Sequence, residues 1–148
     1  MKVYLDMCCF NRPYDDQSQL RIELETKAKL YIQQLIKNKK LEMVTSFMLR
    51  FENAQNPFIM RRDAISDFID GFSSQFVSSA RLSEIEGKIN EIKRTGVKQK
   101  DATHIACAIF SRCGCFITTD KRLLKFHSDE IEMMNPIELI DKLEGKTW

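Results

Sequence analysis

Four acidic side chains stand at positions where their carboxylates could share one site: Asp6, Glu52, Asp101 and Asp120. Asp6 and Asp120 each follow a short apolar run of the kind that forms a buried strand. The carboxyl ends of parallel strands meet at one edge of a sheet, where ligands bind. Asp101 lies near the start of a predicted helix, where the helix dipole stabilises a negative charge. The pattern therefore predicts a carboxylate cluster at one edge of a sheet.

Such a cluster favours metal-assisted chemistry. Carboxylates that converge repel one another, and some stay protonated unless a cation joins them. Oxygen ligands suit Mg²⁺ or Mn²⁺, and a bound divalent ion activates water for attack on a phosphodiester. We therefore expect the same four acids to serve as metal ligands and as catalytic residues in phosphoryl hydrolysis.

Basic residues lie close in sequence to these acids. Arg12, Lys98 and Lys121 each lie within six residues of one of the acids, which favours a polyanionic substrate whose phosphates need counter-charge. The alternative for Lys121 and Arg122 is a solvated helix turn. The net charge of +2 does not by itself indicate nucleic-acid binding.

The elements that would position these residues alternate along the chain. Asn56-Pro57 and Asn135-Pro136 are helix-start signals, and Ser83 with Glu86 forms a predicted capping box. Strands separated by helices indicate a mostly parallel sheet with helices on both faces, an α/β sandwich. The predicted strands are 2–5, 41–45, 76–79, 115–119 and 131–134, and the predicted helices are 17–38, 46–54, 56–70, 83–95, 98–112 and one from 136.

Composition places the chain among ordinary globular proteins. Its 148 residues, 43% hydrophobic and 30% charged, predict one domain over 1–148. No apolar run approaches the roughly 18 residues of a membrane span, and the start of the chain does not read as an export signal. We therefore expect a cytoplasmic protein, not a membrane protein, whose five cysteines are reduced thiols without zinc-site spacing.

Four segments together resemble the PIN domain, a family that includes the VapC-type toxins of bacterial toxin–antitoxin pairs. They are 4–6 (YLD), 46–52 (SFMLRFE), 101–106 (DATHIA) and 117–120 (ITTD), and in order and spacing they cover essentially the whole chain. The resemblance implies a three-layer sandwich around a five-stranded parallel sheet, and Mg²⁺- or Mn²⁺-dependent cleavage of RNA. It also implies two kinds of protein partner, an antitoxin and a second copy of the chain.

Individual roles also follow from the resemblance. It makes Asp6, Glu52, Asp101 and Asp120 the metal-site acids, and Thr118 the polar residue that accompanies the last acid at the substrate. His104 lies one helical turn after Asp101, and we expect it to be packed or hydrogen-bonded rather than a metal ligand.

The sequence departs from the family pattern in the segment 7–13 (MCCFNRP), where a small polar residue is usual after the first acid. Asn11 or Arg12 is the candidate to replace that polar contact to metal or phosphate.

There are two alternatives, one a different enzyme and the other a protein without catalytic activity. A phosphatase of the haloacid dehalogenase type also begins with a strand and an aspartate, but it needs a second acid two residues later, where this chain has Cys8. The other alternative is a non-catalytic RNA- or protein-binding module that keeps the PIN fold. The presence of all four acids favours the nuclease.

Overall fold

Five parallel strands form the centre of the protein, which is described here over residues 1–145 by a computed structural model. The sheet order is β3-β2-β1-β4-β5, so β1 is central and its neighbours are reached by crossover connections. Tyr4 on β1 pairs with Val44 on one side and Phe116 on the other. The strands are β1 (Lys2–Leu5), β2 (Glu42–Ser46), β3 (Ser73–Val77), β4 (Cys115–Ile117) and β5 (Glu132–Met134).

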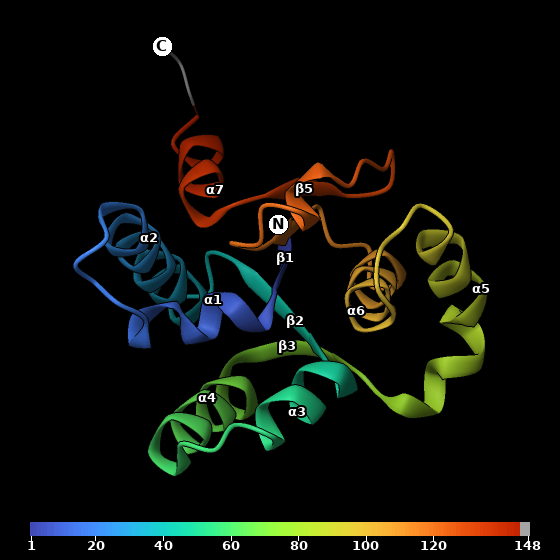
Figure 1. The fold of residues 1–148 in the computed structure, drawn as a ribbon, viewed down its shortest axis with the longest axis horizontal. Helices are drawn as coiled ribbons and strands as arrows, with labels where there is room; N and C mark the ends of the chain where they lie inside the picture. Colours follow the sequence, from blue (N-terminus) through green and yellow to red (C-terminus); the bar gives the residue numbers. More distant parts are fainter. Residues whose placement is uncertain (146–148) are drawn as a thin grey trace.

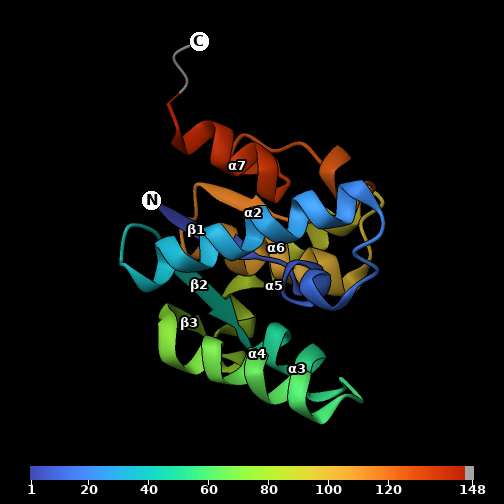
Figure 2. The same cartoon turned by 90° about the vertical axis from the view of Figure 1, so that its left-hand side faces the viewer.

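Helices cover both faces of this sheet. In Figure 1, α1, α2 and α7 lie on one side, α5 and α6 on the other, and α3 and α4 beside the β3 edge. Figure 2 shows α2 crossing in front of the sheet with α7 above it. The helices are α1 (Met7–Asn11), α2 (Leu20–Lys37), α3 (Phe47–Ala54), α4 (Ile59–Phe72), α5 (Leu82–Lys93), α6 (Gln99–Phe110) and α7 (Pro136–Leu143). The predicted three-layer α/β sandwich is confirmed.

The central strands are buried on both faces, which explains their continuous apolar sequences. Val3, Tyr4 and Leu5 have no solvent exposure, and the Tyr4 ring stacks on Phe116 with 5.3 Å between ring centroids. This packing fixes the direction in which the chain leaves β1, and hence the position of the residue that follows. Within residues 1–145, no helix combines the length and apolar character that a membrane span requires.

Two predicted helix starts are wrong. The helix predicted from Asn56-Pro57 begins at Ile59, because the Asn56 side chain accepts the backbone N–H of Phe58 (3.0 Å) and forms a turn instead. The capping box at Ser83 is not formed, since α5 begins at Leu82. By contrast, Asn135 and Glu138 form a reciprocal capping box that starts α7, as the Asn-Pro signal predicts.

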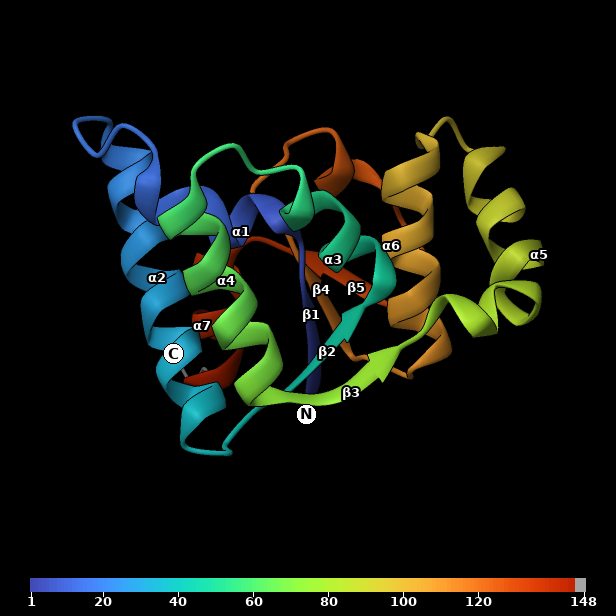
Figure 3. The ribbon, with the colours of Figure 1, turned by 90° about the horizontal axis from the view of Figure 1, so that it is seen from below.

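Two further differences lie beside the sheet. Strand β3 begins at Ser73, directly after α4, and not at Phe76 as predicted. The polar residues at its start do not indicate a strand, but they pair with the backbone of β2. A short helix, α1, follows Asp6 where no element was predicted. In Figure 3, α1, the α3–α4 connection and the start of α6 gather at the edge where the strands end.

Candidate metal centre

Asp6 is held rigidly at the end of β1. Its backbone N–H donates to the Ile117 carbonyl (2.9 Å), so the residue continues the sheet. One carboxylate oxygen caps α1 by accepting the Met7 N–H (2.8 Å), and the other accepts the Thr118 hydroxyl (2.9 Å). The residue is 7% exposed, so the carboxylate is almost fully enclosed by the protein.

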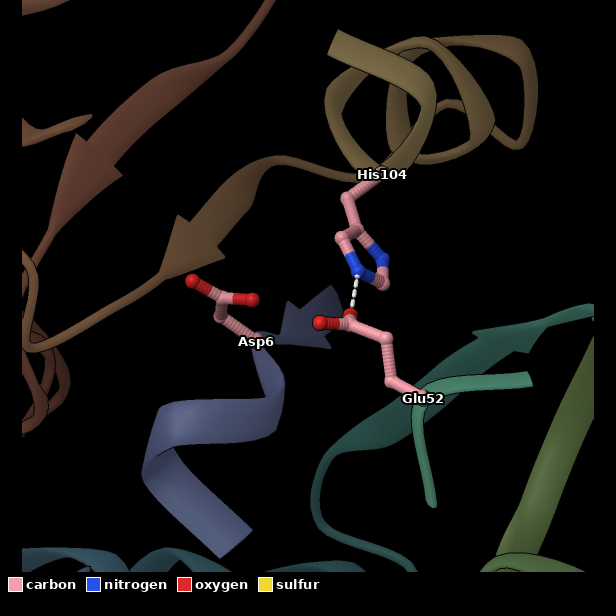
Figure 4. A group of neighbouring side chains, drawn as sticks. All are labelled: Asp6, Glu52 and His104. Atoms are coloured by element: carbon pink, nitrogen blue, oxygen red, sulfur yellow. Dashed lines mark hydrogen bonds and ion pairs between the residues drawn. The ribbon is translucent and has the colours of Figure 1, made fainter. Parts of the chain in front are cut away.

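Glu52 reaches the same space from α3 and is hydrogen-bonded to His104 from α6 (Figure 4). A carboxylate only accepts, so the His104 Nε2 carries the proton of this bond. In a neutral ring Nδ1 then accepts from the Tyr4 hydroxyl, which lies 2.6 Å away. Tyr4 in turn accepts from Ser46 at 2.6 Å. This Ser46–Tyr4–His104–Glu52 chain fixes the direction of the glutamate.

Burial keeps the Tyr4 hydroxyl, in the middle of this chain of hydrogen bonds, uncharged. Burial raises the pKa of the Tyr4 hydroxyl well above its ordinary value, and the charges of Asp6 and Glu52 raise it further. Tyr4 therefore acts as a neutral donor to His104 over the working range of most proteins.

Asp6, Glu52 and His104 each bring a ligand atom to within 4.8 Å of the others' ligand atoms. This spacing and this donor set fit a divalent cation. Both nitrogens of His104 already have hydrogen-bond partners, so the two carboxylates are the better candidates for ligands. His104 then orients Glu52, in the way that outer partners orient metal ligands. The expectation that His104 is hydrogen-bonded is confirmed.

Asp101 and Asp120 do not belong to this tight group, but they lie together on the wall of a cleft of about 340 Å³. Burial raises the pKa of the Asp101 carboxyl, and the charges of Asp120 and Glu52 raise it further, while His104 and Lys98 oppose the shift. The four predicted acids thus act on one another electrostatically, although the structure brings only two of them into direct ligand distance.

Burial also dominates at Asp6. It raises the pKa of this carboxyl to about 8; Cys8 and Asp101 add to the rise, and His104 and the Thr118 hydrogen bond oppose it. A buried carboxylate with a raised pKa gains free energy from a nearby cation. The electrostatics of the metal-free protein therefore favour cation binding at this position.

The residues predicted to bind substrate have different surroundings. Lys98 lines the cleft of Asp101 and Asp120, and Lys121 is exposed directly after Asp120. Arg12 is held in two ion pairs, one with the buried Glu25 (3.0 Å) and one with the exposed Asp15 (3.0 Å).

Thr118 is fully buried, and its hydroxyl serves Asp6 and the Asp120 backbone N–H (3.1 Å). The Thr118 hydroxyl is therefore engaged within the protein, and the Arg12 guanidinium is held by two acids. Their contact with a substrate stays a prediction.

Cys8 is a neighbour that sequence reasoning missed. Its sulfur lies 3.5 Å from Asp6 and 3.3 Å from Thr118, and hydrogen bonds from Cys9, Thr118 and Thr119 lower the pKa of its thiol. The signal was its spacing, two residues after the first acid, which places its side chain beside Asp6 once α1 forms.

Comparisons with known proteins agree on the fold. No family model matches the chain, and no curated protein matches it. Among solved structures, it resembles a chain of VapBC2 from Rickettsia felis, solved bound to a DNA fragment from their promoter, with a TM-score of 0.55 and 13% identity. It also resembles a chain of FitAcB from Neisseria gonorrhoeae, with a TM-score of 0.56 and 14% identity.

Each of these likenesses covers 91% of this chain and 98% of the other. With the parallel sheet and its two helical layers, they show a PIN-like three-layer α/β fold, as the four sequence motifs predict.

Proposed function

We propose that this protein is a metal-dependent endoribonuclease that hydrolyses RNA phosphodiester bonds. The observation that carries the proposal is the convergence of Asp6 and Glu52 at ligand distance. Asp101 and Asp120 lie together on the wall of a cleft, and Asp101 acts electrostatically on both Asp6 and Glu52. A PIN-like fold with all four acids in their motif positions supports it. Mg²⁺ or Mn²⁺ is the proposed ion, because the free donors are hard carboxylate oxygens.

The residues of the chain divide the work. Asp6 and Glu52 would hold the cation, because hydrogen bonds fix the direction of both side chains. Asp101 and Asp120 would complete the anionic cluster. When bound, a divalent ion supplies Lewis-acid stabilisation and a water of lowered pKa. Lys98 would offset the charge of the substrate phosphates at the mouth of the cleft.

The direct test is RNA cleavage by the purified protein. We expect structured or single-stranded RNA to be cut with Mn²⁺ and to stay intact with EDTA. Asp101→Asn should lower cleavage at least about 100-fold, beyond the 10- to 100-fold loss typical of residues around a metal site. Asp67→Asn, an exposed acid on α4, is the matched control and should cleave normally.

Cleavage that persists in EDTA and in Asp101→Asn would rule out the metal-carboxylate proposal. Tight RNA binding without cleavage would instead support a non-catalytic module with the same fold.

We further propose a partner protein of the antitoxin kind, and self-association. The support for a partner protein is that both structural neighbours are chains of named pairs, VapBC2 and FitAcB. Self-association is what the resemblance to the PIN domain implies. Expression of the chain alone should then arrest bacterial growth, and Asp101→Asn should not. Unaffected growth on expression of the wild-type protein would argue against a toxin. Light scattering of the purified chain would test separately whether it is a dimer.

A further inference from the structure

Arg61, on the first turn of α4, has aromatic neighbours in place of an acidic partner. Its guanidinium carbon lies 4.2 Å from the centroid of the Phe58 ring and 4.5 Å from that of Tyr14. Within residues 1–145 no carboxylate lies at ion-pair distance from Arg61, and its buried Nε has no hydrogen-bond partner. Stacking restricts the planar group, so an unneutralised set of N–H donors is held in place.

This guanidinium lies in a cleft that also reaches the metal centre. The cleft has a volume of about 360 Å³, and Phe58 and Arg61 line it together with Glu52 and with Met7 and Asn11 of α1. A second cleft, walled by Asp101 and Asp120, carries cations of its own. Glu52 therefore shares the first cleft with Phe58 and Arg61, whereas Asp101 and Asp120 line the second. Tyr14 stacks on Arg61 from outside the lining of the first cleft.

We propose that Arg61 binds a backbone phosphate of a single-stranded RNA, beside the phosphate that is cut, and that Phe58 and Tyr14 accept a neighbouring base. The proposal rests on the proposed nuclease function, since it places the same substrate across the same acids. A guanidinium binds phosphate oxygens through paired N–H bonds. The two rings are 57% and 44% exposed, so part of each remains open to a base.

The exposed rings favour RNA over an acidic peptide as the occupant. Stacking on aromatic side chains is open to every base and needs bases that are not paired in a duplex. An acidic peptide would use the guanidinium but would gain nothing specific from the rings. Glu52 lines the same cleft, so an RNA strand bound at Arg61 would also reach the candidate metal centre.

The test compares Arg61→Ala with Arg62→Ala, which removes the same charge one residue further along α4. Arg62 lines a different cleft and lies 3.7 Å from Asp63, so it is a matched control. Fluorescence anisotropy with a labelled poly(U) oligoribonucleotide in EDTA measures binding without metal-dependent cleavage. Each affinity is measured between about 50 and 200 mM salt, because the slope reports the number of phosphate contacts.

We expect Arg61→Ala to weaken RNA binding about tenfold, as for a lost hydrogen bond to a charged group. The salt slope should fall by about 0.7, the value for one phosphate on a single strand. Arg61→Lys should keep the slope and lose part of the affinity, and Arg62→Ala should match the wild type. Melting temperatures establish that each variant is folded.

Equal effects of Arg61→Ala and Arg62→Ala would overturn the proposal. So would unchanged RNA binding by Arg61→Ala together with lost binding of a labelled poly-glutamate peptide, which would assign the cleft to a protein partner. If the wild type cleaves RNA but Arg61→Ala binds it normally, the phosphate site is wrong and the nuclease stands. If no RNA is cleaved but the salt slope of Arg61→Ala still falls, the phosphate site stands and the nuclease function is wrong.

Discussion

At the scale of single residues, the site depends on hydrogen bonds that come from the sheet itself. The Tyr4 hydroxyl, on the central strand, bridges Ser46 and His104, and His104 in turn holds Glu52. All four groups lie on different elements, so the chain of bonds connects the core to the candidate metal centre. Removing one member should affect stability and metal binding together.

Tyr4→Phe tests this connection. The change keeps the ring packed on Phe116 but leaves the His104 Nδ1 and the Ser46 hydroxyl without their partner. We expect a loss of about 1–3 kcal/mol in the free energy of unfolding, the usual cost of an unsatisfied buried polar group. Mn²⁺ affinity should fall about 10- to 100-fold, as for residues that orient metal ligands.

Urea unfolding and Mn²⁺ titration are the measurements. Tyr31→Phe on α2 is the control, because that tyrosine is 48% exposed. A stability loss with unchanged Mn²⁺ affinity would show that the bond chain supports the core alone.

The acids could be proposed residue by residue because each has a local signal. The signal is a predicted strand end for Asp6 and Asp120, a predicted helix start and a motif for Asp101, and the spacing from Ser46 for Glu52. The partners of these acids could not. Tyr4 and His104 are 100 residues apart, and the spacing of a strand residue and a helix residue does not say that they meet. Thr118 is predicted to lie at the substrate because the motif shows that it is next to the last acid in sequence. The motif does not show that Thr118 is buried.

At the scale of elements, α2 braces two segments that carry site residues. Glu25 is 1% exposed and pairs with Arg12, just after α1, and with Arg21 on its own helix (3.3 Å). Arg21 also donates to the Thr119 carbonyl (3.0 Å), beside Asp120. The helix thus ties together the segments that follow β1 and β4.

Glu25→Gln should loosen both segments. We expect a loss of about 1–3 kcal/mol in the free energy of unfolding, the cost of leaving a buried polar group without its partner. Arg21 loses its acidic partner, and Arg12 keeps only the exposed Asp15. RNA cleavage should also fall, because the position of Asp120 is less restrained. Urea unfolding and initial cleavage rates measure the two effects.

Glu23→Gln is the matched control on the same helix. Its partner Lys27 is exposed and 3.5 Å away, so the change should cost at most about 0.5 kcal/mol. Equal effects of the two substitutions would contradict the bracing role.

The order of strands and helices could be read from apolar runs and their spacing, because each run is local. Boundaries beside the site were less predictable. Helix α1 forms because the Asp6 side chain caps it. The sequence indicates Asp6 as a metal ligand and gives no sign that it also caps a helix. The start of β3 depends on its partner strand, whose register a single segment does not contain.

At the scale of the whole molecule, the fold buries the carboxyl group of Asp6, whose charged form is unfavourable there. The pKa of Asp6 in the folded, metal-free protein is raised to about 8, against an ordinary value of 3.8. Between these values the unfolded chain has released the proton and the folded chain holds it. Asp6 therefore contributes stability that is complete below about pH 4 and lost as the pH rises through about 8.

A metal ion should reverse this dependence. Binding needs the Asp6 carboxylate without its proton, so Mn²⁺ affinity should rise with pH up to about 8, by as much as about tenfold per pH unit. The stabilisation by Mn²⁺ should then be larger at pH 8 than at pH 6. Melting temperatures with Mn²⁺ and with EDTA, and calorimetric Mn²⁺ titrations across this range, measure both quantities.

Asp6→Asn separates the two effects, because the amide has a similar shape and does not titrate. In EDTA it should be more stable than the wild type at pH 8 and should lose most of the stabilisation by Mn²⁺. Asp67→Asn should follow the wild type at every pH. If Mn²⁺ stabilises Asp6→Asn as much as the wild type, the cation binds elsewhere among the acids. If that stabilisation is lost, Asp6 is a ligand, and its buried charge is unfavourable without the ion and favourable with it.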